Sequence, residues 1–151
     1  MKNPRPILLA EDNPNDVELI LAAFKDANFV NEIHVTQDGE QALDFLHRRG
    51  QYTGRSGPLP AVILLDLKMP KVDGREVLRH VRTDSNLRHI PVVILTSSRE
   101  ENDLLASYQL GANAFVVKPV DFQEFIGAVS RLGFFWAMLN EPPPADSNPP
   151  S

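Results

Sequence analysis

The stretch Ala61–Asp66, with the sequence AVILLD, decides the fold of this 151-residue chain. Five apolar residues in a row, bounded by turn signals, are typical of a strand buried on both faces, as in a parallel sheet. Asp66 then stands at the carboxyl end of the strand, the edge at which open α/β sheets bind ligands. Pro70 and the pair Asp73-Gly74 predict a sharp turn before the next helix. We interpret Asp66 as a candidate phosphoryl acceptor, although alone it is equally consistent with a solvated acid that ends a strand.

Further apolar runs predict four more strands, at residues 7–10, 33–36, 90–95 and 114–117. Helix patterns lie between and after them: capped starts are predicted at Asn13, Ser98 and Asp121, a further helix follows Asp38-Gly39, and another runs from about Arg75 to Arg82. Strands that alternate with helices predict an α/β fold, a doubly wound parallel sheet with helices on both faces. Right-handed crossovers make the flavodoxin-like strand order 2-1-3-4-5 the expected one.

Length and composition indicate one domain, residues 5–139, followed by a proline-rich tail, 140–151, which we expect to be disordered or to dock as a polyproline segment. The net charge of −5 offers no basic face for nucleic acid. Cysteine is absent, which excludes thiol chemistry and disulfides. The first apolar run, 7–10, is too short for a signal peptide or a membrane span. We therefore expect a cytoplasmic protein without nucleic-acid or membrane partners.

Acidic residues and one lysine follow the predicted strands at the same edge of the sheet. They are Glu11 and Asp12 after the first strand, Asp66 at the end of the third and Lys118 after the fifth. Two like charges about 4 Å apart repel by roughly 4 kcal/mol at an effective dielectric of 20, so three carboxylates require compensating cations. Lys118 is one such cation, and Mg²⁺ suits a site of one or two carboxylates, waters and a phosphate.

The chemistry expected of this edge is transfer of a phosphoryl group to a carboxylate. Asp66 is the predicted nucleophile, and Asp12 is expected to hold the ion, with Glu11 acting through water. Lys118 and the hydroxyl of Thr96, at the end of the fourth strand, are expected to contact phosphoryl oxygens. Each residue alone has an ordinary explanation as a helix-entry residue or a surface charge. Their placement at the ends of neighbouring strands is what favours the site.

Residues 5–138 resemble a response-regulator receiver domain of two-component signalling. The resemblance rests on the motifs LAEDN at 9–13, LDLKMP at 65–70 with Asp73-Gly74, LTS at 95–97, and Phe115 three residues before the pair Lys118-Pro119. It implies that the phosphohistidine of a sensor histidine kinase donates to Asp66. It also implies a metal ligand from the backbone carbonyl of Lys68, a cis peptide bond before Pro119, and a switch in which Thr96 moves toward the phosphoryl group and Phe115 fills the vacated space.

Two positions depart from the commonest family pattern. Glu11 replaces the first of two aspartates, a variant that keeps the expected water-mediated role. Phe115 stands where many members have tyrosine, so that switching at this position would depend on packing without a hydroxyl.

Three other functions fit the sequence less well. A phosphatase of the haloacid-dehalogenase type would need a second aspartate two residues after the first, where this chain has Lys68. A nucleotide- or flavin-binding module would need a glycine- or hydroxyl-rich loop after the first strand, where the acids at 11–12 repel phosphate. A docking module that is never phosphorylated would not need the acceptor, metal and lysine positions that are present.

The output of the domain is expected to be partner binding. The long loop at 49–60 and an aromatic last helix resemble the single-domain regulators of bacterial phytochrome kinases, as in cyanobacteria. On that helix, Phe134, Phe135 and Met138 form an apolar cluster beyond the predicted core stripe. Such patches usually mark interfaces, so we predict a symmetric homodimer through this helix. The alternative is that these side chains fold over their own domain.

Overall fold

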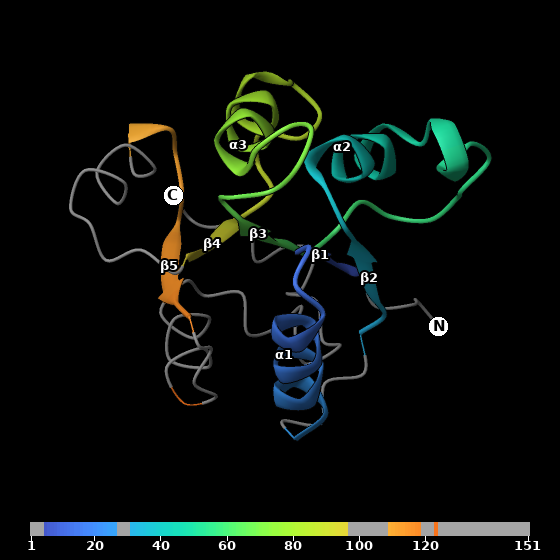
Figure 1. Ribbon diagram of the computed structural model, residues 1–151. Helices are drawn as coiled ribbons and strands as arrows, with labels where there is room; N and C mark the ends of the chain where they lie inside the picture. Colours follow the sequence, from blue (N-terminus) through green and yellow to red (C-terminus); the bar gives the residue numbers. More distant parts are fainter. Residues whose placement is uncertain (1–4, 27–30, 97–108, 119–122, 124–151) are drawn as a thin grey trace, which may run out of the picture.

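The computed structural model describes residues 5–26, 31–96, 109–118 and 123, and the structural statements below concern those residues. They form a five-stranded parallel sheet in the order β2-β1-β3-β4-β5, which confirms the predicted topology (Figure 1). The strands are β1 (Ile7–Ala10), β2 (Ile33–Thr36), β3 (Val62–Asp66), β4 (Val92–Thr96) and β5 (Ala114–Val117). The helices are α1 (Pro14–Asp26), α2 (Gly39–His47), the short 3₁₀ turn η1 (Gly50–Tyr52) and α3 (Gly74–Thr83).

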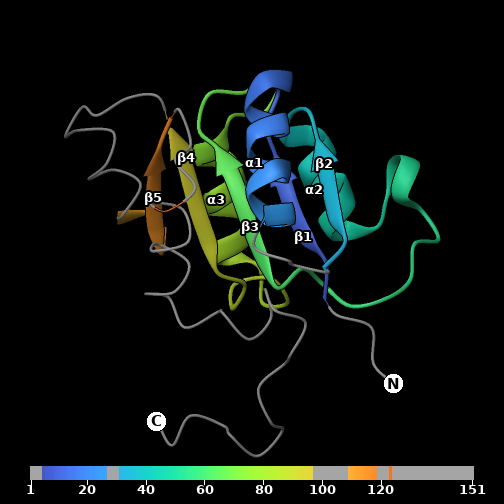
Figure 2. The ribbon, with the colours of Figure 1, turned by 90° about the horizontal axis from the view of Figure 1, so that it is seen from below.

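The described helices lie on both faces of the sheet. Helix α1 covers one face, and α2 and α3 lie side by side on the other (Figures 1 and 2). Side chains of β3 alternate between the two cores: Ile63 and Leu65 pack with α2 and α3, whereas Val62 and Leu64 pack on the α1 side with Phe24. All five residues of β3 are buried, as its unbroken apolar run predicts.

Short polar side chains start the three described α-helices. Asn13 Oδ1 accepts the backbone N–H of Asn15 at 2.8 Å, Asp38 caps α2 through the N–H of Gln41, and Asp73 caps α3 through that of Glu76. Because each cap follows a strand by only a few residues, the start of each helix lies at the carboxyl edge of the sheet. The candidate site is located at this edge.

Some sequence-based boundaries need correction. The fourth strand begins at Val92 and not at Ile90, because the N–H of Ile90 bonds to Leu87 in a turn and Pro91 has no N–H to give to a ladder. The expected loop at 49–60 contains the 3₁₀ turn, and Tyr52 from this turn packs edge-on against Phe45 of α2 at 5.2 Å between ring centroids. This contact attaches the loop to the domain.

Several predictions concern residues that the structure does not describe. They are the helix after Ser98, the peptide bond before Pro119, most of the last helix with the proposed dimer residues Phe134, Phe135 and Met138, and the tail at 140–151. Within the described ranges, no helix has the length and apolar character needed to cross a membrane.

Candidate phosphoryl-acceptor site

Strand register brings the predicted site residues together. Asp66, the last residue of β3, is paired with Leu95 of β4, so that Thr96 is one position beyond it on the neighbouring strand. The backbone N–H of Lys118 donates to the Thr96 carbonyl at 2.8 Å, which places the lysine next to the end of β4. Glu11 follows β1 directly on the other side of Asp66. The structure thus places the four predicted strand-end positions at one edge.

Lys118 is the centre of the charge arrangement. Its Nζ lies 2.8 Å from Glu11 Oε1 and 3.3 Å from Asp66 Oδ2, and its side chain is only 12% exposed. The carboxyl groups of Glu11 and Asp66 are themselves almost completely buried. Buried charges are stable only when they are paired, so this lysine holds two acids that would otherwise repel each other.

Asp16 is a third partner of Lys118 that the sequence analysis did not identify. Its Oδ2 lies 3.1 Å from Lys118 Nζ, on the first turn of α1. In the sequence it is indistinguishable from an acid that favours a helix N-terminus. The available signal was positional: α1 starts at the carboxyl edge of the sheet, so a first-turn acid is within reach of a cation there.

The backbone around Asp66 fixes the acceptor. The N–H of Lys68 lies 3.3 Å from Asp66 Oδ1, and the N–H of Gly74 donates to the Leu67 carbonyl at 2.9 Å. A Cβ atom at position 74 would lie 2.3 Å from the Asp66 carbonyl oxygen. Helix α3 therefore starts against the acceptor segment, and only glycine permits this approach.

Burial and neighbouring charges shift the pKa values at the site. Burial raises the pKa of Glu11 to about 7, with Lys118 opposing and the charge of Asp66 adding to the rise. Burial also raises the pKa of Asp66, against the charge of Lys118 and the N–H of Lys68. Burial alone would lower the pKa of Lys118, but its contacts with Glu11, Asp66 and Asp16 raise it. Lys118 is thus held as a cation, and part of the negative charge is still uncompensated.

The donor set beside Lys118 fits a hard divalent cation. Glu11, Asp12 and Asp66 each present a carboxylate oxygen, and these atoms lie within 4.8 Å of one another. Asp12 is exposed, whereas the other two are buried, so an ion at this position would keep waters on its open side. For Lys68 the structure gives the N–H contact with Asp66, and its carbonyl as a metal ligand stays a prediction.

The predicted switch residues lie on the neighbouring strands β4 and β5. Thr96 is 2% exposed at the end of β4. Phe115 is partly buried in β5, where it is paired with Ile94 and packs on the side of the sheet that α2 and α3 cover. Movement of either residue on phosphorylation stays a prediction.

Comparisons with known proteins identify the family. The model of the response regulator receiver domain matches residues 7–130. The chain is 38% identical over 133 residues to the response regulator Rcp1 of Synechocystis sp., covering 88% of this chain and 89% of that protein. It therefore belongs to the response regulator receiver family and is a receiver domain of two-component signalling.

Solved structures agree with this assignment. The bacteriophytochrome response regulator AtBRR is 60% identical, with a TM-score of 0.82 over 91% of this chain and 99% of that one. The Mn²⁺-bound form of Rcp1 is 37% identical, with a TM-score of 0.76 over 94% of this chain and 100% of that one. The phosphorylated cyanobacterial phytochrome response regulator RcpA is 37% identical, with a TM-score of 0.74 over 88% and 94% of the two chains.

Proposed function

We propose that this receiver domain accepts a phosphoryl group on Asp66 in an Mg²⁺-dependent reaction and signals by changing its affinity for partner proteins. The observation that carries the proposal is the position of Lys118 Nζ, 3.3 Å from Asp66 Oδ2 and 2.8 Å from Glu11 Oε1. A cation at this position neutralises charge on an incoming phosphoryl group, and it does so in a site that is largely shielded from water.

Each residue has a separate role in the proposed transfer. A carboxylate oxygen of Asp66 attacks the phosphorus atom and forms the aspartyl phosphate, while the leaving group departs from the opposite side. Lys118 and the Thr96 hydroxyl contact the transferred oxygens. Glu11 and Asp12 would hold Mg²⁺ together with Asp66 and, as a further ligand, the Lys68 carbonyl. When bound, the ion neutralises the charge that the phosphoryl group brings.

Binding of Mg²⁺ is supported by the donor chemistry, since the ligands in reach are carboxylate oxygens. The related Rcp1 has a Mn²⁺-bound structure, and Mn²⁺ shares the preference for oxygen ligands. Acceptance of a phosphoryl group is supported by RcpA, a relative with a phosphorylated structure.

We propose a sensor histidine kinase as the donor, and a bacterial phytochrome as the kinase that fits best. Support comes from AtBRR and RcpA, both named as regulators associated with phytochromes. A cytoplasmic location follows from this partnership and stays a prediction, as do the absence of nucleic-acid partners and the homodimer through Phe134, Phe135 and Met138.

Phosphorylation would be read out through Thr96 and Phe115. A phosphoryl group adds about −1.5 to −2 charge, by analogy with other phosphorylated side chains. A change in the population ratio of two conformations from 1:99 to 99:1 needs about 5.5 kcal/mol of differential stabilisation. New contacts from Lys118 and Thr96 would contribute to that difference.

A phosphodonor assay tests the acceptor assignment. Incubation with Mg²⁺ and acetyl phosphate should add one acid-stable, base-labile phosphoryl group per chain, detected by mass spectrometry. Asp66→Asn should gain none, whereas Asp44→Asn, a control on α2 outside the site, should be labelled like the parent. Equal labelling of Asp66→Asn and the parent would refute the assignment. Release of phosphate from many external monoesters per chain would instead favour the phosphatase alternative.

A further inference from the structure

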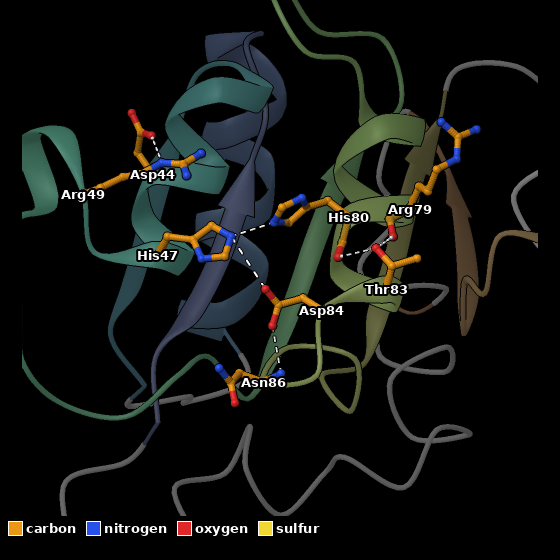
Figure 3. A network of polar contacts seen from close by, with 8 residues as sticks. All are labelled: Asp44, His47, Arg49, Arg79, His80, Thr83, Asp84 and Asn86. Atoms are coloured by element: carbon orange, nitrogen blue, oxygen red, sulfur yellow. Dashed lines mark hydrogen bonds and ion pairs between the residues drawn. The ribbon is translucent and has the colours of Figure 1, made fainter.

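A second cluster of side chains that could hold a metal ion lies between α2 and α3 (Figure 3). It consists of His47 in the last turn of α2, His80 in the last turn of α3, and Asp84, which directly follows α3. Both helices start at the carboxyl edge of the sheet and return, so their last turns lie toward the opposite edge from Asp66. The proposed phosphoryl transfer uses none of these three residues.

The two imidazoles meet through their Nε2 atoms. These atoms are 2.6 Å apart, and the ring planes are nearly perpendicular, at 87°. Two nitrogens at this distance must share a proton or a cation, because two lone pairs facing each other would repel. The contact therefore presents two ligand nitrogens from two different helices to one point.

Asp84 supplies the third candidate ligand. Its Oδ2 lies 4.0 Å from His47 Nε2, while its Oδ1 accepts the backbone N–H of Asn86 at 2.8 Å. A hydrogen bond to the second oxygen is how proteins orient a ligating carboxylate. The oxygen that faces the histidines is thus held in place, as Figure 3 shows.

We propose that His47, His80 and Asp84 form a binding site for a divalent transition-metal ion, Zn²⁺ in particular, that joins α2 to α3. Two imidazoles and one carboxylate are ligands that Zn²⁺ prefers, whereas Mg²⁺ prefers oxygens alone. Ligands about 2.0–2.1 Å from a tetrahedral ion are about 3.3 Å apart. Binding therefore requires the two nitrogens to separate by about 0.7 Å and Asp84 Oδ2 to approach His47 Nε2 by a similar distance.

The surroundings leave open space for a further ligand. A hollow of about 370 Å³ opens beside His47 and Asp84 and would give water access as the fourth ligand. Its other lining residues are Leu46, Arg48, Leu59, Asn86 and Leu87. The Arg49 side chain is itself paired with Asp44 at 2.8 Å, which offsets part of its positive charge.

Calorimetric titration with ZnCl₂ tests the site. The titration is performed at neutral pH in saturating Mg²⁺ and on the Asp66→Asn background, so that the acidic cluster does not contribute. One Zn²⁺ per chain should bind. His47→Gln and His80→Gln should each weaken binding at least about ten-fold, because even the loss of an outer-shell partner costs 10–100-fold. His89→Gln, which changes an exposed histidine outside the cluster, should bind like its background.

Nuclear magnetic resonance of the four histidine rings separates loss of a ligand from loss of folding. Zn²⁺ should shift the ring-nitrogen resonances of His47 and His80 and leave those of His34 and His89 in place. The proposal is overturned if Zn²⁺ leaves the His47 and His80 resonances unmoved, or if both glutamine variants bind Zn²⁺ as tightly as their background. Either result would leave the pair as a proton-sharing contact between two helices. Phosphorylation of Asp66 is measured separately and does not bear on the outcome.

Discussion

Lys118 Nζ lies 2.8 Å from Oε1 of Glu11, a carboxylate whose side chain has no exposed surface. The pair shows that a buried carboxylate and a buried cation are in contact in the absence of a phosphoryl group. Without the lysine, Glu11 would be an unpaired buried anion. Burial raises the pKa of Glu11 to about 7 even though Lys118 opposes this rise.

The raised pKa of Glu11 predicts a pH-dependent stability in chelator. The folded protein binds a proton on Glu11 more tightly than the unfolded chain, so the associated stability is present below the usual pKa of 4.5 and is lost as pH rises through about 7. The difference between 4.5 and about 7, at about 1.4 kcal/mol per pH unit, corresponds to at most about 3.5 kcal/mol. Denaturant unfolding of the parent and Glu11→Gln at pH 5 to 8 measures this contribution of Glu11 to the free energy of unfolding.

The comparison between the two proteins at each pH isolates Glu11. The lowered pKa of His47 acts in the opposite direction, with stability rising with pH, but it contributes equally to parent and variant. A difference in unfolding free energy that stays constant from pH 5 to 8 would contradict the prediction.

Replacing Asp12, the exposed acid of the cluster, should stabilise the metal-free protein but weaken its binding of Mg²⁺. Asp12→Asn should raise the free energy of unfolding in chelator, since repulsion among Glu11, Asp12 and Asp66 is relieved, and should weaken Mg²⁺ binding and slow phosphorylation. Thermal melts with chelator and with Mg²⁺ measure both effects. The start of α1 is capped by Asn13, so the substitution removes no described cap. A clearly less stable variant in chelator would indicate a structural role for Asp12.

Gly74 is expected to be essential to both stability and chemistry. In Gly74→Ala the new Cβ would lie 2.3 Å from the Asp66 carbonyl oxygen, which forces the start of α3 and the acceptor segment apart. We expect a loss of about 1–3 kcal/mol, the usual cost of overpacking, together with slower phosphorylation. Gly57→Ala is the control, because its Cβ meets nothing within 4 Å and only its positive φ is strained. The interpretation fails if both variants are phosphorylated at the parental rate.

Arg82 joins α3 to two other segments, the turn that ends at Ile90 and residues 111–113. Its guanidinium donates to the carbonyls of Ile90 and Gly111 at 2.7 and 2.9 Å and to the side chain of Asn113 at 2.7 Å. Arg82→Met keeps much of the apolar stem and removes these bonds. We expect a loss of about 2–4 kcal/mol, because several partly buried acceptors lose a charged donor.

Arg82→Lys should recover little of that stability, since an ammonium cannot reproduce the planar fork. Arg79, whose described partner is Glu76 on the same helix, is the matched control. Arg79→Met should change the unfolding free energy by less than about 0.5 kcal/mol, the value typical of exposed ion pairs within a helix. Denaturant unfolding of the three variants compares these costs, and equal destabilisation by Arg82→Met and Arg79→Met would contradict the assignment.

The predicted homodimer is tested in solution. If Phe134, Phe135 and Met138 form the interface, the parent should sediment as a dimer at tens of micromolar and Phe134→Asp as a monomer, because a charge in an apolar interface stays unpaired. The measurement is repeated with acetyl phosphate and Mg²⁺, which reveals any dependence on phosphorylation. A parent that stays monomeric in both states would rule out the dimer and leave the cluster for the kinase or for its own domain.

The local physics of the chain determined the order of the elements and most of the site. Unbroken apolar runs such as Ala61–Asp66 have one favourable arrangement, as strands buried between two helix layers, and the short polar caps define where the helices start. Parallel strands then bring their carboxyl ends to one edge. Asp66, Thr96 and Lys118 are therefore predictable as neighbours from the sequence.

Contacts between side chains of separate helices depended on the tertiary structure. The ion pair of Asp16 with Lys118 and the meeting of His47 with His80 depend on how far each helix is rotated and displaced on the sheet. Those parameters follow from the packing of many side chains at once, and no short stretch of sequence encodes them. In the sequence these residues are an ordinary helix acid and two ordinary histidines. Only the packed fold brings their atoms within bonding distance.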